Sequence, residues 1–282
     1  RSTRVSASAA SDVYKRQMLK QRVITALILL PIMLGMLFWA SDGLWAAFSG
    51  LIAVLALWEY GRMCGIGDKE RVPYLAGSAL FMLLAACGGW ALPPIGWCLV
   101  LAFWLVVMPL WLKCKWRLGG GWQAYAVGWM LMLPFWFALV SLRPSEEDAL
   151  SLLAVMGLVW IADIGAYFCG KAFGKNKLAP AISPGKSWEG AFGGVLCVLI
   201  YLSVVREAGW LGFDLPWLPT MLAGVVLAAV SVCGDLLESW LKRVAGVKDS
   251  SNLLPGHGGV FDRVDSMIAV LSVYAAIVSI AS

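Results

Sequence analysis

The stretch Ser239–Ser266, SWLKRVAGVKDSSNLLPGHGGVFDRVDS, decides how this chain is organised, because it places a dense set of polar side chains between two apolar segments. It also holds His257, the only histidine of the chain. A polar helix face beside a lipid-facing span in so apolar a chain indicates a functional site. The charged residues here are the cations Lys242, Arg243, Lys248 and Arg263 and the carboxylates Asp249, Asp262 and Asp265.

The composition outside this stretch is that of a membrane protein. Of the 282 residues, 61% are hydrophobic and only 14% are charged, and the mean hydropathy is +0.80. Soluble domains carry about 25% charged residues, so we expect an integral membrane protein in contact with the lipid bilayer. The basic residues lie along the edges of apolar segments, so the net charge of +5 does not indicate a nucleic-acid partner. The seven cysteines are scattered singly, so the sequence predicts neither a disulfide framework nor a zinc site.

Nine segments are long and apolar enough to cross a bilayer as helices, which takes about 20 residues. Proline and glycine lie in the gaps between them, as expected of loops. The sequence therefore predicts an all-α, polytopic membrane protein with about nine transmembrane helices. The predicted spans are Val23–Trp39, Leu44–Gly61, Tyr74–Leu92, Ile95–Leu112, Ala124–Leu142, Leu150–Cys169, Gly190–Val205, Trp217–Leu237 and Val264–Ala281.

The chain divides into three parts on this reading. We expect residues 1–17, which are polar and rich in Ser and Ala, to be a disordered leader, with Met18 as a candidate for the native start. Residues 18–148 would form the N-terminal transmembrane helices. Residues 149–282 would form the C-terminal, catalytic transmembrane region.

Charge predicts the orientation of the spans. If alternate gaps face the same side, that side holds sixteen basic residues, whereas the other side holds only Arg143 and Arg206. The positive-inside rule then places the N-terminal end in the cytoplasm and the C-terminus outside. The sixteen are Lys20, Arg22, Arg62, Lys69, Arg71, Lys113, Lys115, Arg117, Lys171, Lys175, Lys177, Lys186, Lys242, Arg243, Lys248 and Arg263.

Asp235 and Asp262 lie at the cytoplasmic edge of the last two predicted helices. Two carboxylates that meet there repel each other unless a cation lies between them, and Mg²⁺ prefers one or two carboxylates together with phosphate oxygens. The alternative is that Lys242 or Arg263 neutralises them in structural ion pairs. On the eighth span, Asp235, Glu238, Ser239 and Lys242 share one helix face, since they are spaced i, i+3, i+4 and i+7. Glu59 is a further carboxylate within a span, for which the sequence offers no role.

A second polar region runs from Asp163 to Gly194. Lys186 and Ser187 lie at the predicted start of the seventh span, where free N–H groups favour anions. Lysines in such a loop more often reflect the positive-inside rule alone. Gly190 and Gly194 form a small-xxx-small pair, which predicts close helix packing.

The segment Pro255–Gly259 (PGHGG) cannot be helical, and its glycines allow backbone N–H groups to face an anion. Ser239–Asp265 as a whole resembles the signature of the phosphatidate cytidylyltransferases (CDP-diacylglycerol synthases). The residues that match, without any change in spacing, are Ser239, Lys242-Arg243, Lys248-Asp249, Pro255, His257-Gly258-Gly259, Asp262-Arg263 and Asp265. Residues 160–190, WIADIGAYFCGKAFGKNKLAPAISPGKSWEG, are also similar to that family.

The resemblance implies an enzyme that joins CTP and phosphatidic acid into CDP-diacylglycerol and pyrophosphate, at the cytoplasmic side of a bacterial inner membrane. It implies Asp235 and Asp262 as ligands of Mg²⁺, with a second cation and a homodimer left open. We expect the catalytic residues to be Asp235, Asp262, Lys242, Arg263 and Asp265. We expect the substrate-binding residues to be Asp163, Lys186, Ser187, Ser239, Arg243, Lys248, His257, Gly258 and Gly259.

Two other functions remain open at this point. A CTP-dependent lipid kinase would transfer the γ-phosphate and release CDP. A cation transporter would use the carboxylates within the spans, although it would not explain the loop rich in Lys, Gly and His.

Overall fold

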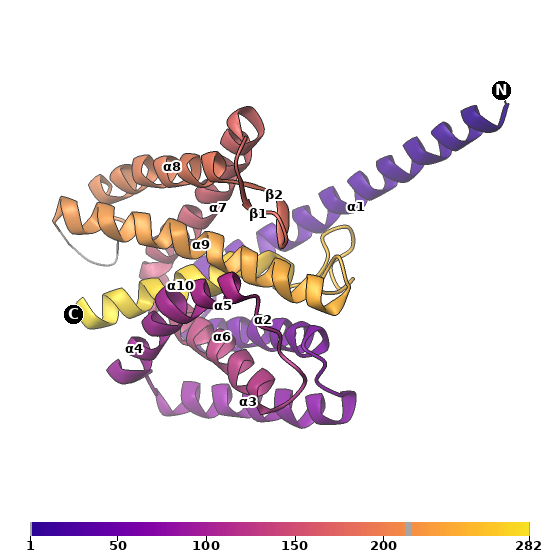
Figure 1. The fold of residues 1–282 in the computed structure, drawn as a ribbon. Coiled ribbons are helices and arrows are strands. Elements are labelled where there is room, and N and C mark those ends of the chain that lie inside the picture. The colour runs from indigo at the N-terminus through magenta and orange to yellow at the C-terminus, as the bar shows by residue number, and fades with distance from the viewer. Residues whose placement is uncertain (1, 212–215, 282) are drawn as a thin grey trace.

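The computed structural model describes residues 2–211 and 216–281, and helices dominate this part of the chain (Figure 1). Nine helical segments there are long and apolar enough to cross a membrane, and each overlaps one predicted span. The all-α, polytopic prediction is therefore confirmed. The helices are α1 Ser2–Trp39, α2 Asp42–Met63, α3 Asp68–Gly88, α4 Pro94–Ala102, α5 Met108–Cys114, α6 Trp122–Ser141, α7 Ala149–Phe173, α8 Trp188–Glu207, α9 Trp217–Ala245 and α10 Phe261–Ala281, with the short helices η1 Phe103–Val107 and η2 Glu146–Asp148.

Two details differ from the predicted elements. Helix α1 begins at Ser2 and continues through the stretch that we expected to be a disordered leader, in which no proline or glycine interrupts the helix. The fourth span is not one regular α-helix, because η1 is a π-helical segment between α4 and α5 in which Met108 N–H donates to Phe103 O. Pro109 follows directly and has no N–H to donate, so a local change of helical register is expected there.

Helix α10 is the centre of the bundle. It contacts α9 and α7 on one side and α2, α4 and α6 on the other, and in Figure 1 it lies between these two groups. Its side chains from Ser266 to Ala276 are all buried. By contrast, Leu27 on α1 and Leu196 on α8 are more than half exposed, as expected of side chains that face lipid.

Polar contacts tie the ends of the helices together in two groups. At one end, Arg22 and Thr25 of α1 bond to the loop between α9 and α10, as does Glu59 of α2. At the other end, the buried Arg143 donates from Nε to Leu37 O (2.8 Å) and from Nη2 to Ala40 O (2.6 Å). Each group joins ends that the alternating topology assigns to the same side. Which side is cytoplasmic remains a prediction from the charges.

A small antiparallel hairpin interrupts the helices between α7 and α8. It consists of β1 Lys177–Ala179 and β2 Ser183–Ser187, and β2 leads directly into α8. The sequence predicted only a loop here. Arg243 Nε of α9 donates to Ile182 O in the turn of this hairpin (3.3 Å) and so fixes it against the bundle.

Candidate active site

Ser187 ends the hairpin and caps the N-terminus of α8. Its Oγ accepts a hydrogen bond from Gly190 N–H at 3.2 Å, the usual way in which a serine satisfies a free amide at a helix start. Lys186, one residue earlier, reaches across to α9, where its Nζ lies 2.6 Å from Asp235 Oδ2. The predicted position of these two residues at the start of a span is confirmed, while their role in binding remains a prediction.

Helices α7 and α8 pack closely at this point because both present small residues. A Cβ added to Gly190 or Gly194 would lie 2.8 Å from the carbonyl oxygen of Ala166 or Ala162, respectively. These contacts confirm the predicted packing role of the glycine pair. No larger side chain fits there without moving one of the helices.

A cavity of about 540 Å³ lies between α7, α8, α9 and the hairpin. Asp163, Lys186, Ser187 and Asp235 line it together with small and apolar residues such as Ala162, Gly194 and Val232. Four residues expected from separate parts of the sequence therefore surround one space. An apolar cavity with an ion pair in its wall suits a ligand that has an apolar part and a charged part.

Three carboxylates, which we call the acid cluster, gather beside this cavity: Asp235 and Glu238 of α9 and Asp265 of α10. One oxygen from each lies within 4.8 Å of the others, a spacing that could hold a metal ion. Ser239 Oγ donates to Asp235 Oδ1 at 3.3 Å, and Lys242 Nζ lies 2.7 Å from Glu238 Oε1. The predicted helix face of α9 is therefore confirmed.

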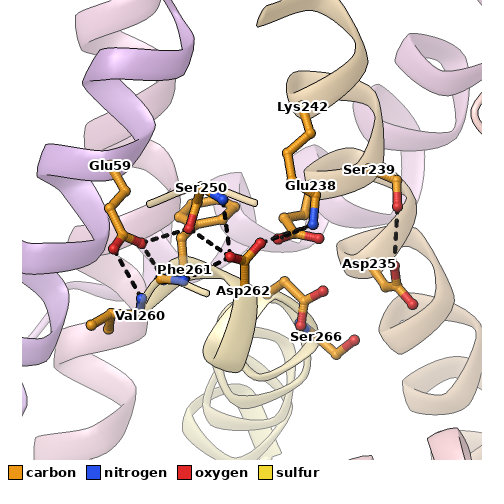
Figure 2. A network of polar contacts seen from close by, with 12 residues as sticks. Glu59, Asp235, Glu238, Ser239, Lys242, Ser250, Val260, Phe261, Asp262 and Ser266 are labelled. Atoms are coloured by element: carbon orange, nitrogen blue, oxygen red, sulfur yellow. Dashed lines mark hydrogen bonds and ion pairs between the residues drawn. The ribbon is translucent and has the colours of Figure 1, made fainter. Parts of the chain in front are cut away.

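Asp262 lies next to the acid cluster and has a different set of partners (Figure 2). Its Oδ1 accepts from Lys242 Nζ at 2.8 Å, and its Oδ2 accepts from Ser250 N–H at 2.9 Å and Gly259 N–H at 2.8 Å. Asp235 is thus grouped with Glu238 and Asp265, and Lys242 joins Asp262 to that group. The ion pair with Lys242 is the structural alternative that the sequence left open.

A second cavity, of about 440 Å³, lies under the loop between α9 and α10. Several residues expected to bind substrate line it, and so does Arg22 of α1, which the sequence did not single out. The Nδ1 atom of His257 is buried there and has no hydrogen-bond partner among the described residues. The lining includes Arg22, Lys248, Asp249, His257, Gly258 and Arg263.

The glycines of this loop are required by its path. Gly256 and Gly258 have φ of +74° and +82°, values at which other residues are strained. Arg22 Nε donates to Gly256 O at 3.0 Å, and Thr25 Oγ1 donates to Pro255 O at 2.9 Å. The first helix thereby fastens the loop that presents His257, a contact between residues 234 positions apart that no local pattern reveals.

Comparison with known proteins identifies the family of this chain. The model of the cytidylyltransferase family matches residues 20–281. The chain is 45% identical to a phosphatidate cytidylyltransferase of Pseudomonas aeruginosa, over 92% of this chain and 97% of the relative. It is 34% identical to a phosphatidate cytidylyltransferase of Haemophilus influenzae, over 92% of this chain and 98% of that relative. This chain therefore belongs to the cytidylyltransferase family.

Proposed function

We propose that this protein transfers the cytidylyl group of CTP to phosphatidic acid, giving CDP-diacylglycerol and pyrophosphate. The observation that carries the proposal is the placement of the acid cluster at one end of the membrane helices. The apolar cavity lies beside this cluster, and the loop between α9 and α10 lines a second cavity that is rich in cations. Full-length relatives named phosphatidate cytidylyltransferase support the same reaction.

The two cavities suit the two substrates. The cavity between α7, α8 and α9 has apolar walls for a lipid and Lys186 for its phosphate. The loop cavity offers Arg22, Lys248 and Arg263, cations that would bind the triphosphate of CTP. His257, in the wall of the same cavity, would be a phosphate contact. In this proposal the acyl chains stay in the bilayer while the nucleotide comes from water, and the site would lie at the cytoplasmic face of a bacterial inner membrane.

In the reaction, an oxygen of the phosphatidate phosphate attacks the α-phosphorus of CTP. A new P–O bond forms there, and the bond between the α-phosphorus and the bridging oxygen breaks, so that pyrophosphate leaves. A phosphate monoester has a second pKa of about 6, and the attacking oxygen is therefore largely deprotonated at neutral pH. Lysine and arginine side chains would hold the two anions together against their mutual repulsion.

The charges of the site favour a divalent metal ion, which we propose to be Mg²⁺. The site contains four carboxylates and two lysines, so its formal net charge is −2 when all of them are ionised, and Asp163 on the cavity wall adds a further negative charge. These groups are Asp235, Glu238, Asp262, Asp265, Lys186 and Lys242. A bound Mg²⁺ would offset negative charge on the phosphate oxygens. Asp235 is its first candidate ligand, with Glu238 and Asp265 beside it and Asp262 as the ligand that the family resemblance implies.

The products of CTP turnover test this proposal. Purified protein in detergent should release pyrophosphate only when phosphatidic acid, CTP and Mg²⁺ are all present. Release of CDP with a newly phosphorylated lipid would identify a lipid kinase instead. Absence of turnover together with cation flux in proteoliposomes would favour a transporter.

A further inference from the structure

Glu59 is a fully buried carboxylate near the C-terminal end of α2. Its Oε1 accepts from Val260 N–H at 3.0 Å and from Ser251 Oγ at 2.6 Å. Its Oε2 accepts from Phe261 N–H at 2.6 Å and lies 2.9 Å from Ser250 Oγ. Figure 2 shows this carboxylate facing the loop and the first residues of α10.

The donors match what a carboxylate alone can accept. Each oxygen of Glu59 accepts one backbone N–H and lies within hydrogen-bond distance of one hydroxyl, so the surroundings offer a partner to each of the four lone-pair positions of an ionised carboxyl group. Among the described residues no basic side chain forms an ion pair with it. Glu59 therefore satisfies the free amides at the start of α10 as a capping group from another helix.

A short path leads from Glu59 to the acid cluster. Ser250 Oγ lies between two carboxylates, 2.9 Å from Glu59 Oε2 and 3.0 Å from Asp262 Oδ2, so its one proton can go to either. Gly259 lies against the same group, because a Cβ there would overlap Ser250 Oγ and both oxygens of Glu59. Asp262 in turn holds Lys242, which also pairs with Glu238 of the acid cluster.

We propose that Glu59 is a positioning residue of the active site: it fixes the loop and the start of α10 so that Asp262 and Lys242 face the acid cluster. This inference rests on the function proposed above. Glu59 touches neither cavity, so its effect would pass through Ser250, Gly259 and the first turn of α10. Supporting residues of this kind around metal sites typically contribute about 10- to 100-fold in affinity or activity.

Glu59→Gln tests the acceptor argument with almost no change in shape. One oxygen becomes an amide NH₂ group, which accepts no hydrogen bond and, in either orientation, would face a backbone N–H of Val260 or Phe261. We expect kcat to fall by about 10- to 100-fold, with a smaller change in the KM for CTP. The Mg²⁺ concentration for half-maximal activity should rise, and amide hydrogen exchange over residues 250–261 should become faster.

Two neighbouring serines provide a matched pair in case Glu59→Gln does not fold. Ser250→Ala removes the hydroxyl that reaches both Glu59 and Asp262, whereas Ser251→Ala removes one that reaches Glu59 but not Asp262. We expect Ser250→Ala to lower kcat and raise the Mg²⁺ requirement, and Ser251→Ala to lower thermal stability while its kinetics stay close to wild type. Equal effects of the two substitutions on kcat would overturn the inference, because Glu59 would then serve the fold alone.

The design separates this inference from the proposed function. If the wild-type protein shows no turnover, the proposed function fails, and hydrogen exchange then decides the inference. Unchanged exchange over residues 250–261 in Glu59→Gln would contradict it. If the wild type turns over and folded Glu59→Gln keeps its kcat and Mg²⁺ response, only the positioning role fails.

Discussion

Asp265→Asn should stabilise the metal-free protein and remove most of its response to Mg²⁺. Asp265 is the member of the acid cluster with no ion pair among the described residues, and its Oδ1 accepts from Ser266 N–H at 2.7 Å. An asparagine keeps an oxygen for that bond. The substitution therefore removes a negative charge from the cluster without breaking a described contact.

The size of the effect follows from the spacing of the carboxylates. The cluster oxygens lie within 4.8 Å of one another, and two unit charges at that limit interact by about 3.5 kcal/mol at an effective permittivity of 20. Lys186 and Lys242 offset part of this repulsion, and Asp235 is partly exposed. We therefore expect a net gain of about 1–2 kcal/mol without metal, or roughly 2–8 °C in Tm.

Thermal unfolding in detergent, at mildly alkaline pH and with either EDTA or Mg²⁺, measures both effects. A wild-type site at 100 times its Kd should gain about 2.7 kcal/mol from Mg²⁺, and Asp265→Asn should gain much less. Glu147→Gln, an exposed carboxylate outside the site, is the control and should change neither value. If Asp265→Asn is less stable than wild type in EDTA and responds equally to Mg²⁺, the acid cluster is not a metal site.

Three further predictions concern binding, packing and topology. Lys186→Ala should raise the KM for phosphatidic acid while the protein remains folded, because the cavity loses the lysine that pairs with Asp235; unchanged kinetics would leave Lys186 with no role beyond the positive-inside charge pattern. Gly194→Leu should destabilise the protein by about 1–3 kcal/mol through overpacking of α7 against α8. Gly77→Leu should not, because no atom lies within 4 Å of the added Cβ. If thermal unfolding shows the same loss of stability in both variants, packing is not the cause. Reporter fusions after Gly65 and Lys177 should report the cytoplasm and a fusion at the C-terminus the opposite side, and a cytoplasmic C-terminus would refute the predicted orientation.

The spans and the helix face of α9 could be predicted because both depend on local patterns. Length and hydropathy define a membrane helix, and spacings of three and four residues bring Asp235 and Glu238 to one side of α9. The family resemblance around His257 could also be recognised, since the order of these residues in the chain is itself the signal. The hairpin before α8 was missed because Lys171–Gly190 is short, polar and without strand periodicity.

The contacts between distant segments could not be predicted. Which carboxylate of α10 lies nearest Asp235 depends on the rotation of that helix. The sequence paired Asp235 with Asp262, whereas the structure groups Asp235 with Glu238 and Asp265, and Asp262 contacts Lys242 of α9. Glu59 and Ser250 are 191 positions apart. Their contact follows from the packing of α2 near the start of α10, and a single carboxylate within an apolar span does not indicate its partner.

The fate of each phosphorus atom of CTP tests the central claim most directly. Purified protein would be incubated with phosphatidic acid, Mg²⁺ and CTP labelled either at the α- or at the γ-phosphorus, and the lipid would then be extracted. We predict that the α-label enters the lipid and that the γ-label leaves as pyrophosphate. Asp235→Asn should show neither the incorporation of the α-label nor the release of labelled pyrophosphate. Recovery of the γ-label in the lipid would contradict cytidylyl transfer by this site. So would the absence of both labels from the lipid after incubation with the wild-type protein.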